Sequence, residues 1–237
     1  MNKRSLGLKS SELNSRPERL DQIIHHEQIV KVFQGIQFTR QLPHLIMYGP
    51  PGTGKTSIIL AFLKEVFGPD HYKERVMEMN ASDDRGIQKV REKIKRYAET
   101  KMSRLPPEYP HYKVIILDEA DQMTVDAQHA LRRIIEDYSS VTRFCLICNY
   151  ITKIIEPLNS RCVKFQFKKI PVEQQLAKLN EICDNENLEV PEGDIINLIN
   201  LTDGDLRKSV NLLQLARISF ASNRFNYDNI LQISDVT

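Results

Sequence analysis

Short apolar runs alternate with longer amphipathic stretches through the first two thirds of the chain. Apolar residues recur at helical spacing between these runs, as at Ile87, Val90 and Ile94. Strands that alternate with helices are typical of a parallel sheet covered on both faces, so the pattern predicts an α/β domain. The runs expected to form its five buried strands are residues 44–49, 75–80, 113–119, 143–149 and 163–167.

The strand pattern stops at Phe167. Three amphipathic stretches follow, each starting at proline or Asp/Gly punctuation, and a short fourth helix is expected near Tyr227. We therefore predict an α/β domain over residues 1–167 and a small all-helical domain over residues 168–237.

Charge and hydropathy narrow the class of protein. Lys and Arg total 33 against 31 Asp and Glu, a net charge of +2, so any basic binding surface has to be local. No apolar run approaches the length of a membrane span, and the first residues lack the apolar core of a signal peptide. We expect a soluble, intracellular protein without membrane contact.

The cysteine pattern argues against a metal site. Cys145 and Cys148 share an expected strand at a spacing that puts them on opposite faces of the sheet, whereas metal ligands must converge. We therefore predict buried, reduced thiols, which fit a cytosolic or nuclear compartment.

The motif "GPPGTGKT" follows the first expected strand and opens a helix, which is the context of a phosphate-binding loop. Its backbone N–H groups surround a β-phosphate, Lys55 reaches the β- and γ-phosphates, and Thr56 binds Mg²⁺. The sequence thus predicts ATP and Mg²⁺ as cofactors. The expected nucleotide-binding residues of this segment are Gly49, Pro50, Pro51, Gly52, Thr53, Gly54, Lys55, Thr56 and Ser57.

Carboxylates follow the third strand in "VIILDEAD". The carboxyl ends of parallel strands share one edge of a sheet, so we expect Asp118 near the metal and Glu119 as general base on water. A DEAD-box helicase would carry further signatures that this chain lacks, such as a Ser-Ala-Thr triplet and a second sheet domain. The pattern therefore favours ATP hydrolysis at a phosphate-loop site.

Two asparagines end neighbouring strands at the same edge. Asn149 is expected to hold the attacking water or sense the γ-phosphate, and Asn80 to hydrogen-bond Glu119 and restrain it. In the helical domain, "TDGDLRKSV" puts Arg207 in the first turn of a helix capped by Asp203 or Asp205. A cation there opposes the helix dipole, which indicates an anionic partner such as the γ-phosphate, with a local salt bridge as the alternative.

Taken together and in order, "GPPGTGKT", "ILDEAD", "NASDDRG", "LICN", "SRC" and "GDLRKSVNLLQ" resemble clamp-loader ATPases of the AAA+ class, specifically small subunits of replication factor C. The resemblance covers roughly Arg16 to the carboxyl terminus. It implies a five-stranded AAA+ domain, a helical lid, and the use of ATP in a five-subunit ring that opens a sliding clamp and places it on primer–template DNA. A nuclear location follows from this role.

The resemblance also assigns residue roles. Asn149 matches the family's first sensor, Arg207 its second sensor, and Arg161 the arginine finger of the Ser-Arg-Cys motif. Arg16 and Pro17 are what remains of a Trp-x-x-Lys-Tyr-Arg-Pro segment that helps to hold adenine. The family's helical collar domain should begin near Ser234, where this chain stops, so we expect either a fragment or an unusually short subunit without the collar.

A basic helix is the expected DNA contact. Residues 85–101 carry Lys and Arg away from the apolar stripe, and helix amino termini bind phosphates through free N–H groups. The family places template DNA against this helix and the start of "TVDAQHALRRIIE". The expected contacts, to backbone rather than bases, are Arg85, Gln88, Lys89 and Arg91. The resemblance also implies that the proline-rich loop 102–111 touches the sliding clamp.

Arg161 precedes the last expected strand, whereas the phosphate loop follows the first. In a parallel sheet these positions lie at opposite edges, about 15–20 Å apart, so Arg161 is predicted to act in trans on a neighbouring subunit's ATP. Two alternatives remain: a nucleotide-binding structural subunit that does not hydrolyse ATP, and an AAA+ helicase motor such as a branch-migration ATPase.

Overall fold

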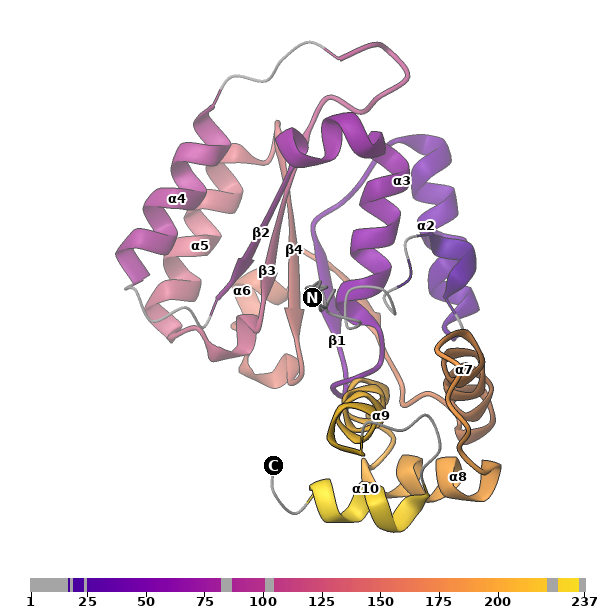
Figure 1. Cartoon of the computed structure of the whole chain (residues 1–237). Helices are drawn as coiled ribbons and strands as arrows, with labels where there is room; N and C mark the ends of the chain where they lie inside the picture. Colours follow the sequence, from indigo (N-terminus) through magenta and orange to yellow (C-terminus); the bar gives the residue numbers. More distant parts are fainter. Residues whose placement is uncertain are drawn as a thin grey trace, which may run out of the picture. The chain divides into compact units, whose positions relative to one another are not determined.

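In the computed structural model of this chain, five short strands form one parallel sheet in the order β2-β3-β4-β1-β5, of which Figure 1 labels β1 to β4. The structure describes residues 17, 19–23, 25–81, 87–100, 105–220 and 226–234, except the side chains of residues 87–91, 220, 233 and 234. The predicted five-stranded sheet is confirmed, and each strand ends within two residues of its expected bounds. The strands are β1 (Leu45–Tyr48), β2 (Val76–Asn80), β3 (Lys113–Asp118), β4 (Thr142–Cys148) and β5 (Val163–Gln166).

Alternating side chains along the strands build two separate apolar layers. Leu45 and Met47 of β1 point to the face covered by α2 (Glu27–Thr39) and α3 (Lys55–Arg75), while Ile46 points to the opposite face. That opposite face packs against α4 (Ile87–Glu99), α5 (Val125–Tyr138) and α6 (Glu156–Asn159), as Figure 1 shows. The sheet is therefore buried on both faces, as expected for parallel strands.

Short helical turns and one irregular helix complete the sheet unit. Helix α3 is interrupted at Gly68, which directly precedes Pro69. The φ of 65° and ψ of 170° at Gly68 lie outside the helical region. The 3₁₀ turns are η1 (Leu20–Gln22), η2 (Ala120–Gln122) and η3 (Ile151–Lys153).

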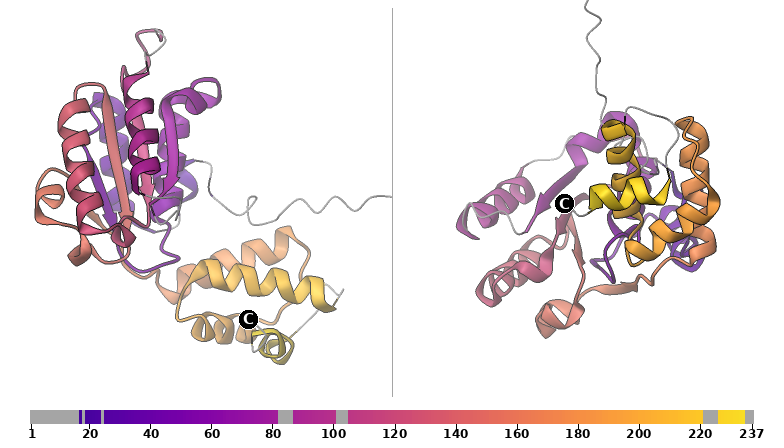
Figure 2. Two further views of the ribbon diagram at one scale, coloured as in Figure 1. Left: turned by 90° about the vertical axis from the view of Figure 1, so that its left-hand side faces the viewer. Right: turned by 60° about the horizontal axis from the view of Figure 1, so that its bottom comes forward.

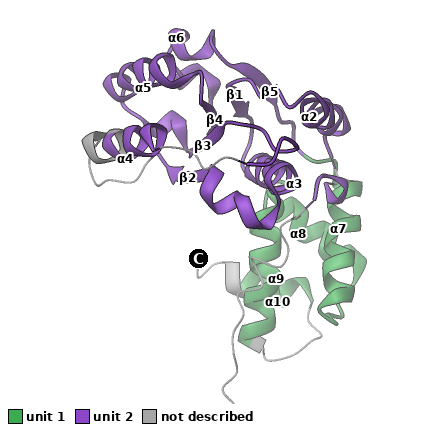
Figure 3. Ribbon diagram, turned by 90° about the horizontal axis from the view of Figure 1, so that it is seen from above, with its two compact units in different colours: residues 1–17, 170–237 green, residues 18–169 purple. Residues whose placement is uncertain are grey.

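The chain divides into two compact units, Glu18–Lys169 and Ile170–Thr237, and Pro17 is grouped with the second (Figure 3). The second unit is a bundle of helices (Figure 2), as the sequence predicts. Leu179, Ile195 and Leu213 come from three different helices and meet in its apolar core. Its helices are α7 (Val172–Asn185), α8 (Glu192–Leu201), α9 (Leu206–Phe220) and α10 (Tyr227–Ser234).

The cysteines are buried and unbridged, as predicted. Cys145 belongs to the apolar layer under α3, and Cys148 to the layer under α5, so the two thiols lie on opposite faces of the sheet. Burial raises the pKa of Cys148 to about 12 and that of Cys162 to about 11, which keeps both thiols neutral. Across the described residues, no helix is long and apolar enough to cross a membrane.

Candidate active site at the carboxyl ends of the strands

The phosphate loop begins where β1 and β5 end side by side. Gly49 follows β1 with a φ of 146°, and a Cβ at this position would lie 2.1 Å from the carbonyl oxygen of Phe167. Phe167 in turn donates its N–H to the carbonyl of Tyr48 at 2.8 Å. No side chain fits at Gly49, so the first glycine of the motif is required by the close approach of these two chain segments.

Lys55 lies under the loop and is only 8% exposed. Its ammonium donates to the carbonyl oxygens of Gly49 and Pro50 at 2.7 and 2.8 Å, and to Oδ1 of Asn149 at 3.0 Å. The loop thus holds the lysine at its centre and connects it to the end of β4. A cation in this position is suited to bind phosphate oxygens.

Thr56 and Asp118 join the start of α3 to the end of β3. The hydroxyl of Thr56 donates to Oδ2 of Asp118 at 2.9 Å. These are hard oxygen donors of the type that Mg²⁺ prefers, and Mg²⁺ sites with few protein ligands are completed by phosphate oxygens and water. The described residues contain no group of three or more His, Cys, Asp or Glu side chains that could hold a metal alone. The pair therefore fits a magnesium ion that arrives with a nucleotide.

Glu119 adopts a left-handed backbone conformation, with φ 55° and ψ 36°. This conformation is costly for a residue with a side chain and is frequent at functional sites. The N–H of Glu119 donates to Oδ1 of Asp118 at 2.9 Å, and the Glu119 side chain is exposed. The chain therefore turns sharply after Asp118, which fixes that carboxylate between the Thr56 hydroxyl and the Glu119 N–H.

Asn80 ends β2 directly beside Asp118. The two residues are partners in the strand register, and the following N–H, of Ala81, donates to the Asp118 carbonyl at 2.7 Å. The Asn80 side chain is exposed, and its hydrogen bond to Glu119 stays a prediction.

Asp121 is a site residue that sequence reasoning missed. It is 6% exposed, and its Oδ2 accepts the N–H groups of Asn149 and Tyr150, each at 3.2 Å. Asp121 thus holds the end of β4 and with it the amide that contacts Lys55. The sequence signal for it is the second Asp of "DEAD".

Gln128 is a second missed residue, in the first turns of α5. Its Nε2 donates to the carbonyls of Met123 and Lys153 at 3.2 and 2.9 Å, and its Oε1 accepts the N–H of Ile155 at 2.8 Å. The side chain is 1% exposed. Gln128 ties α5 to the connection that runs from Asn149 toward Arg161.

His26 lies against the phosphate loop from the start of α2. Its ring packs edge-on against Phe167, with centroids 4.7 Å apart. Burial lowers the pKa of His26 to about 4. The nearby His25 lowers this pKa further, whereas a hydrogen bond to the Thr53 backbone raises it. The ring is therefore neutral at physiological pH.

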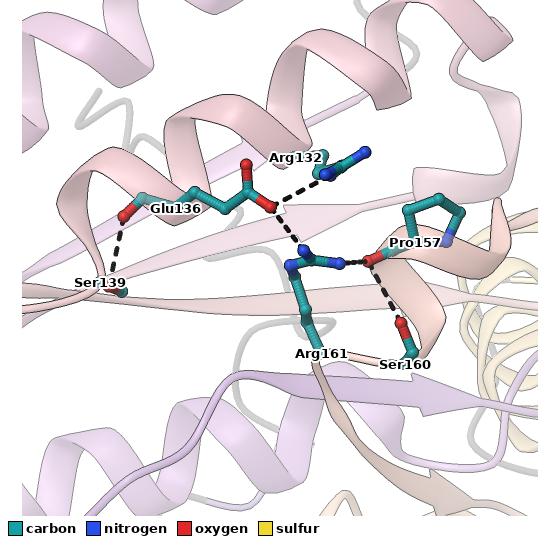
Figure 4. Close-up of polar contacts among 6 residues, drawn as sticks. All are labelled: Arg132, Glu136, Ser139, Pro157, Ser160 and Arg161. Carbon is teal, nitrogen blue, oxygen red and sulfur yellow. Dashed lines mark hydrogen bonds and ion pairs between the residues drawn. The ribbon is translucent and has the colours of Figure 1, made fainter.

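Arg161 lies at the other end of the strands. Strands β1 and β5 are paired from Leu45 and Val163 to Tyr48 and Gln166. Arg161 comes before the start of this pairing, and the phosphate loop comes after its end. Six residue steps, through the four residues of β5 and those that flank it, separate the two places by roughly 20 Å. The side chain of Arg161 contacts Glu136 and the carbonyl of Pro157 (Figure 4).

Arg207 lies in the first turn of α9, as predicted. Oδ1 of Asp205 accepts the N–H groups of Arg207 and Lys208 at 3.0 and 3.2 Å, so Asp205, and not Asp203, caps the helix. The Arg207 side chain is exposed.

The remaining predicted residues are only partly described. Arg16 and Arg85 lie outside the described residues, as do the side chains of Gln88, Lys89 and Arg91 at the start of α4. Ser57 in α3 and Pro17 are half-buried. The loop predicted to touch the clamp is described from Leu105 onward, where the carbonyl of Pro107 accepts a hydrogen bond from Arg40 at 2.6 Å.

Comparisons with known proteins place this geometry in a family. Residues 45–170 match the model of the ATPase family associated with various cellular activities (AAA). The chain is 49% identical to replication factor C subunit 2 of Saccharomyces cerevisiae over 208 residues, which cover 85% of this chain and 59% of that protein. It is 48% identical to replication factor C subunit 4 of Homo sapiens over 204 residues, or 85% of this chain and 56% of that protein. The chain thus spans less than two thirds of the length of these relatives.

Solved structures agree on the fold. The Thermotoga maritima RuvB Holliday junction branch migration motor superposes with a TM-score of 0.68 over 94% of this chain and 72% of that chain. The identity is 18%, so this likeness shows the fold alone. The predicted resemblance to replication factor C small subunits is confirmed by the relatives, and the chain belongs to the ATPase family associated with various cellular activities (AAA).

Proposed function

We propose that this chain is an ATPase subunit of a clamp loader, equivalent to a small subunit of replication factor C. In this role it couples ATP binding and hydrolysis to loading a sliding clamp onto primer–template DNA. The observation that carries the proposal is a set of two hydrogen-bonded pairs, Lys55–Asn149 and Thr56–Asp118, at the ends of three neighbouring strands. Its relatives share nearly half of the aligned residues and are replication factor C subunits.

Each side chain has a proposed part in the reaction. The loop N–H groups bind the β-phosphate, and Lys55 exchanges its carbonyl partners for β- and γ-phosphate oxygens. Thr56 and Asp118 hold Mg²⁺, which when bound neutralises charge on the phosphates. Glu119 accepts the proton of the attacking water, Asn149 orients that water or senses the γ-phosphate, and Asn80 restrains Glu119.

Other parts of the chain complete the proposed site. Residues 1–167 act as the nucleotide-binding domain and residues 168–237 as its helical lid, whose Arg207 contacts the γ-phosphate. Arg16 and Pro17 lie at the adenine side. Arg161 stabilises transition-state charge on the ATP of a neighbouring subunit, so that hydrolysis needs the assembled, DNA-bound ring.

The proposed partners are the other replication factor C subunits, a sliding clamp and primer–template DNA, in the nucleus. Arg85, Gln88, Lys89 and Arg91 contact the DNA backbone without reading bases, so binding weakens as salt rises. The alternative is a structural subunit that binds ATP without hydrolysing it. The Asp118–Glu119 pair favours hydrolysis, because Glu119 would have no task in a purely structural subunit.

The proposal is tested by comparing the wild-type chain with Glu119→Gln in the assembled complex with clamp and DNA. We expect Glu119→Gln to bind ATP within about twofold of wild type and to lose hydrolysis at this site by about 10²–10³-fold, since only the proton acceptor is removed. Lys55→Ala should abolish ATP binding at this site and serves as the negative control.

Single-turnover hydrolysis and nucleotide titration are the measurements. Glu173→Gln, at an exposed glutamate in the first turn of α7, is the matched control and should leave both unchanged. Equal turnover by Glu119→Gln and wild type would exclude Glu119 as the base. Binding without hydrolysis by the wild-type site would establish the structural alternative instead.

A further inference from the structure

A single carboxylate holds the proposed trans-acting arginine. Oε1 of Glu136, near the end of α5, lies 2.5 Å from Nη2 of Arg161 and 3.1 Å from Nε of Arg132 (Figure 4). Nη1 of Arg161 donates to the carbonyl of Pro157 at 2.7 Å. The guanidinium is thus held from two sides, by a side chain of α5 and by the backbone of α6.

The backbone under Arg161 is fixed as well. Its N–H donates to the carbonyl of Leu158 at 3.1 Å, which continues the turn of α6, and the next residue, Cys162, is buried in the layer under α5. Both ends of this long side chain are therefore anchored, although the side chain itself is 36% exposed. An exposed arginine otherwise samples many rotamers.

The ion pairs of Glu136 with Arg132 and Arg161 are expected to contribute little to the stability of the fold. Exposed ion pairs contribute little to the free energy of unfolding because water screens them, and the Glu136 side chain is 39% exposed. The hydrogen bond from Arg132, with the charges of Arg132 and Arg161, lowers the pKa of Glu136, so this carboxylate stays ionised. Its effect is on where the guanidinium lies.

We propose that Glu136 is a positioning residue that orders Arg161 for contact with the nucleotide of a neighbouring subunit. This inference rests on the proposed trans role of Arg161. Two arginines share one carboxylate, so the group keeps one net positive charge and still attracts a triphosphate. A preordered guanidinium also loses less conformational entropy when it meets that anion.

Glu136 could have the opposite role and mask Arg161, and the two roles predict opposite changes in the rate of ATP hydrolysis. If Glu136 instead masked Arg161, removing the carboxylate would release the arginine and raise hydrolysis. Positioning predicts that hydrolysis falls.

The experiment measures steady-state ATP hydrolysis by the complex assembled with partner subunits, clamp and DNA. We expect Glu136→Ala to lower kcat at the neighbouring site by about tenfold and to leave KM for ATP unchanged, because ground-state binding uses the neighbour's own loop. Glu136→Gln keeps an oxygen acceptor and should recover most of the rate. Glu181→Ala is the matched control: it removes an exposed glutamate paired with Lys178 on α7 and should change nothing.

A double variant separates positioning from a merely structural effect. In an Arg161→Ala background, Glu136→Ala should cause no further loss, since it acts through the missing guanidinium. Additive losses, or a rise in kcat for Glu136→Ala, would overturn the inference. If Arg161→Ala alone leaves the neighbour's rate unchanged, the proposed function of Arg161 fails. If Arg161→Ala lowers the rate and Glu136→Ala does not, only the role of Glu136 fails.

A second test does not depend on ATP hydrolysis and uses the isolated chain. Nitrogen-15 NMR of the arginine side chains should show slowed rotation of the Arg161 guanidinium in wild type and faster rotation in Glu136→Ala, with Arg161→Lys used for assignment. Equal rotation rates in folded wild type and Glu136→Ala would contradict the inference.

Discussion

Lys55 and Arg161 lie at opposite ends of the parallel sheet, and the two positively charged side chains are held in different ways. At the carboxyl ends, Lys55 is 8% exposed and surrounded by loop carbonyls and Asn149. At the amino ends, the Arg161 side chain is 36% exposed and held by an exposed glutamate. Main-chain geometry builds the first site, whereas the second cation is held at the surface by an exposed ion pair, where we propose that it meets a neighbouring subunit.

The largest expected contrast between the two ends comes from Arg161→Ala. It should leave nucleotide binding by this chain within twofold of wild type, because the phosphate loop lies roughly 20 Å away. It should slow hydrolysis at the neighbouring site by about 10³-fold, the scale of a lost arginine finger. Nucleotide titration on the chain and single-turnover hydrolysis in the assembled complex are the two measurements.

Arg19→Ala is the matched control for this variant. Arg19 is an exposed arginine paired with Asp21, and its loss should affect neither quantity. Loss of the chain's own nucleotide binding in Arg161→Ala, with the neighbour unaffected, would reverse the assignment of the two ends.

A glycine pair tests the claim that the carboxyl end is built by the main chain. Gly49→Ala should lower the free energy of unfolding by about 3 kcal/mol or more, because the new Cβ meets the Phe167 carbonyl at 2.1 Å. Gly35→Ala is the control, at an exposed position of α2 where nothing lies within 4 Å of the new Cβ. That substitution should instead stabilise the protein by about 0.5–1 kcal/mol. Urea denaturation of both variants measures the difference, and equal stabilities would show that the loop tolerates a side chain.

Much of the sheet and of the site could be predicted from the sequence because each signal is local. Apolar runs mark the five strands, and the residues after them, such as Asp118 and Asn149, meet at one edge by the geometry of parallel strands. The phosphate loop is recognisable because the glycines and Lys55 occur in one short segment.

What the sequence did not predict depends on contacts between distant segments. Gln128 and Glu136 look like ordinary polar residues of a helix, and the role of Asp121 within its motif is not evident from the sequence. The contacts of all three are with partners 25 or more residues away, such as Lys153 or Arg161.

The smallest expected effect is a pH dependence at the amino end of the sheet. His44 precedes β1, and its Nδ1 accepts the N–H of Phe144 at 3.2 Å. Burial, with the positive charge of Arg143, lowers its pKa from 6.5 to about 4. The folded state thus favours the neutral ring, so the stability that His44 contributes is complete above pH 6.5 and is lost as the pH falls toward 4.

We expect this loss to be about 1 kcal/mol after allowance for the partial exposure of the ring. Urea denaturation at pH 7, 5.5 and 4.5 should show it as a difference between wild type and His44→Gln, which keeps an acceptor but cannot titrate. His26 titrates in the same direction in both proteins and cancels in that difference. Parallel pH profiles for the two proteins would mean that the ring becomes charged without cost, and that the amino end of the sheet is more open to water than its partly buried hydrogen bond indicates.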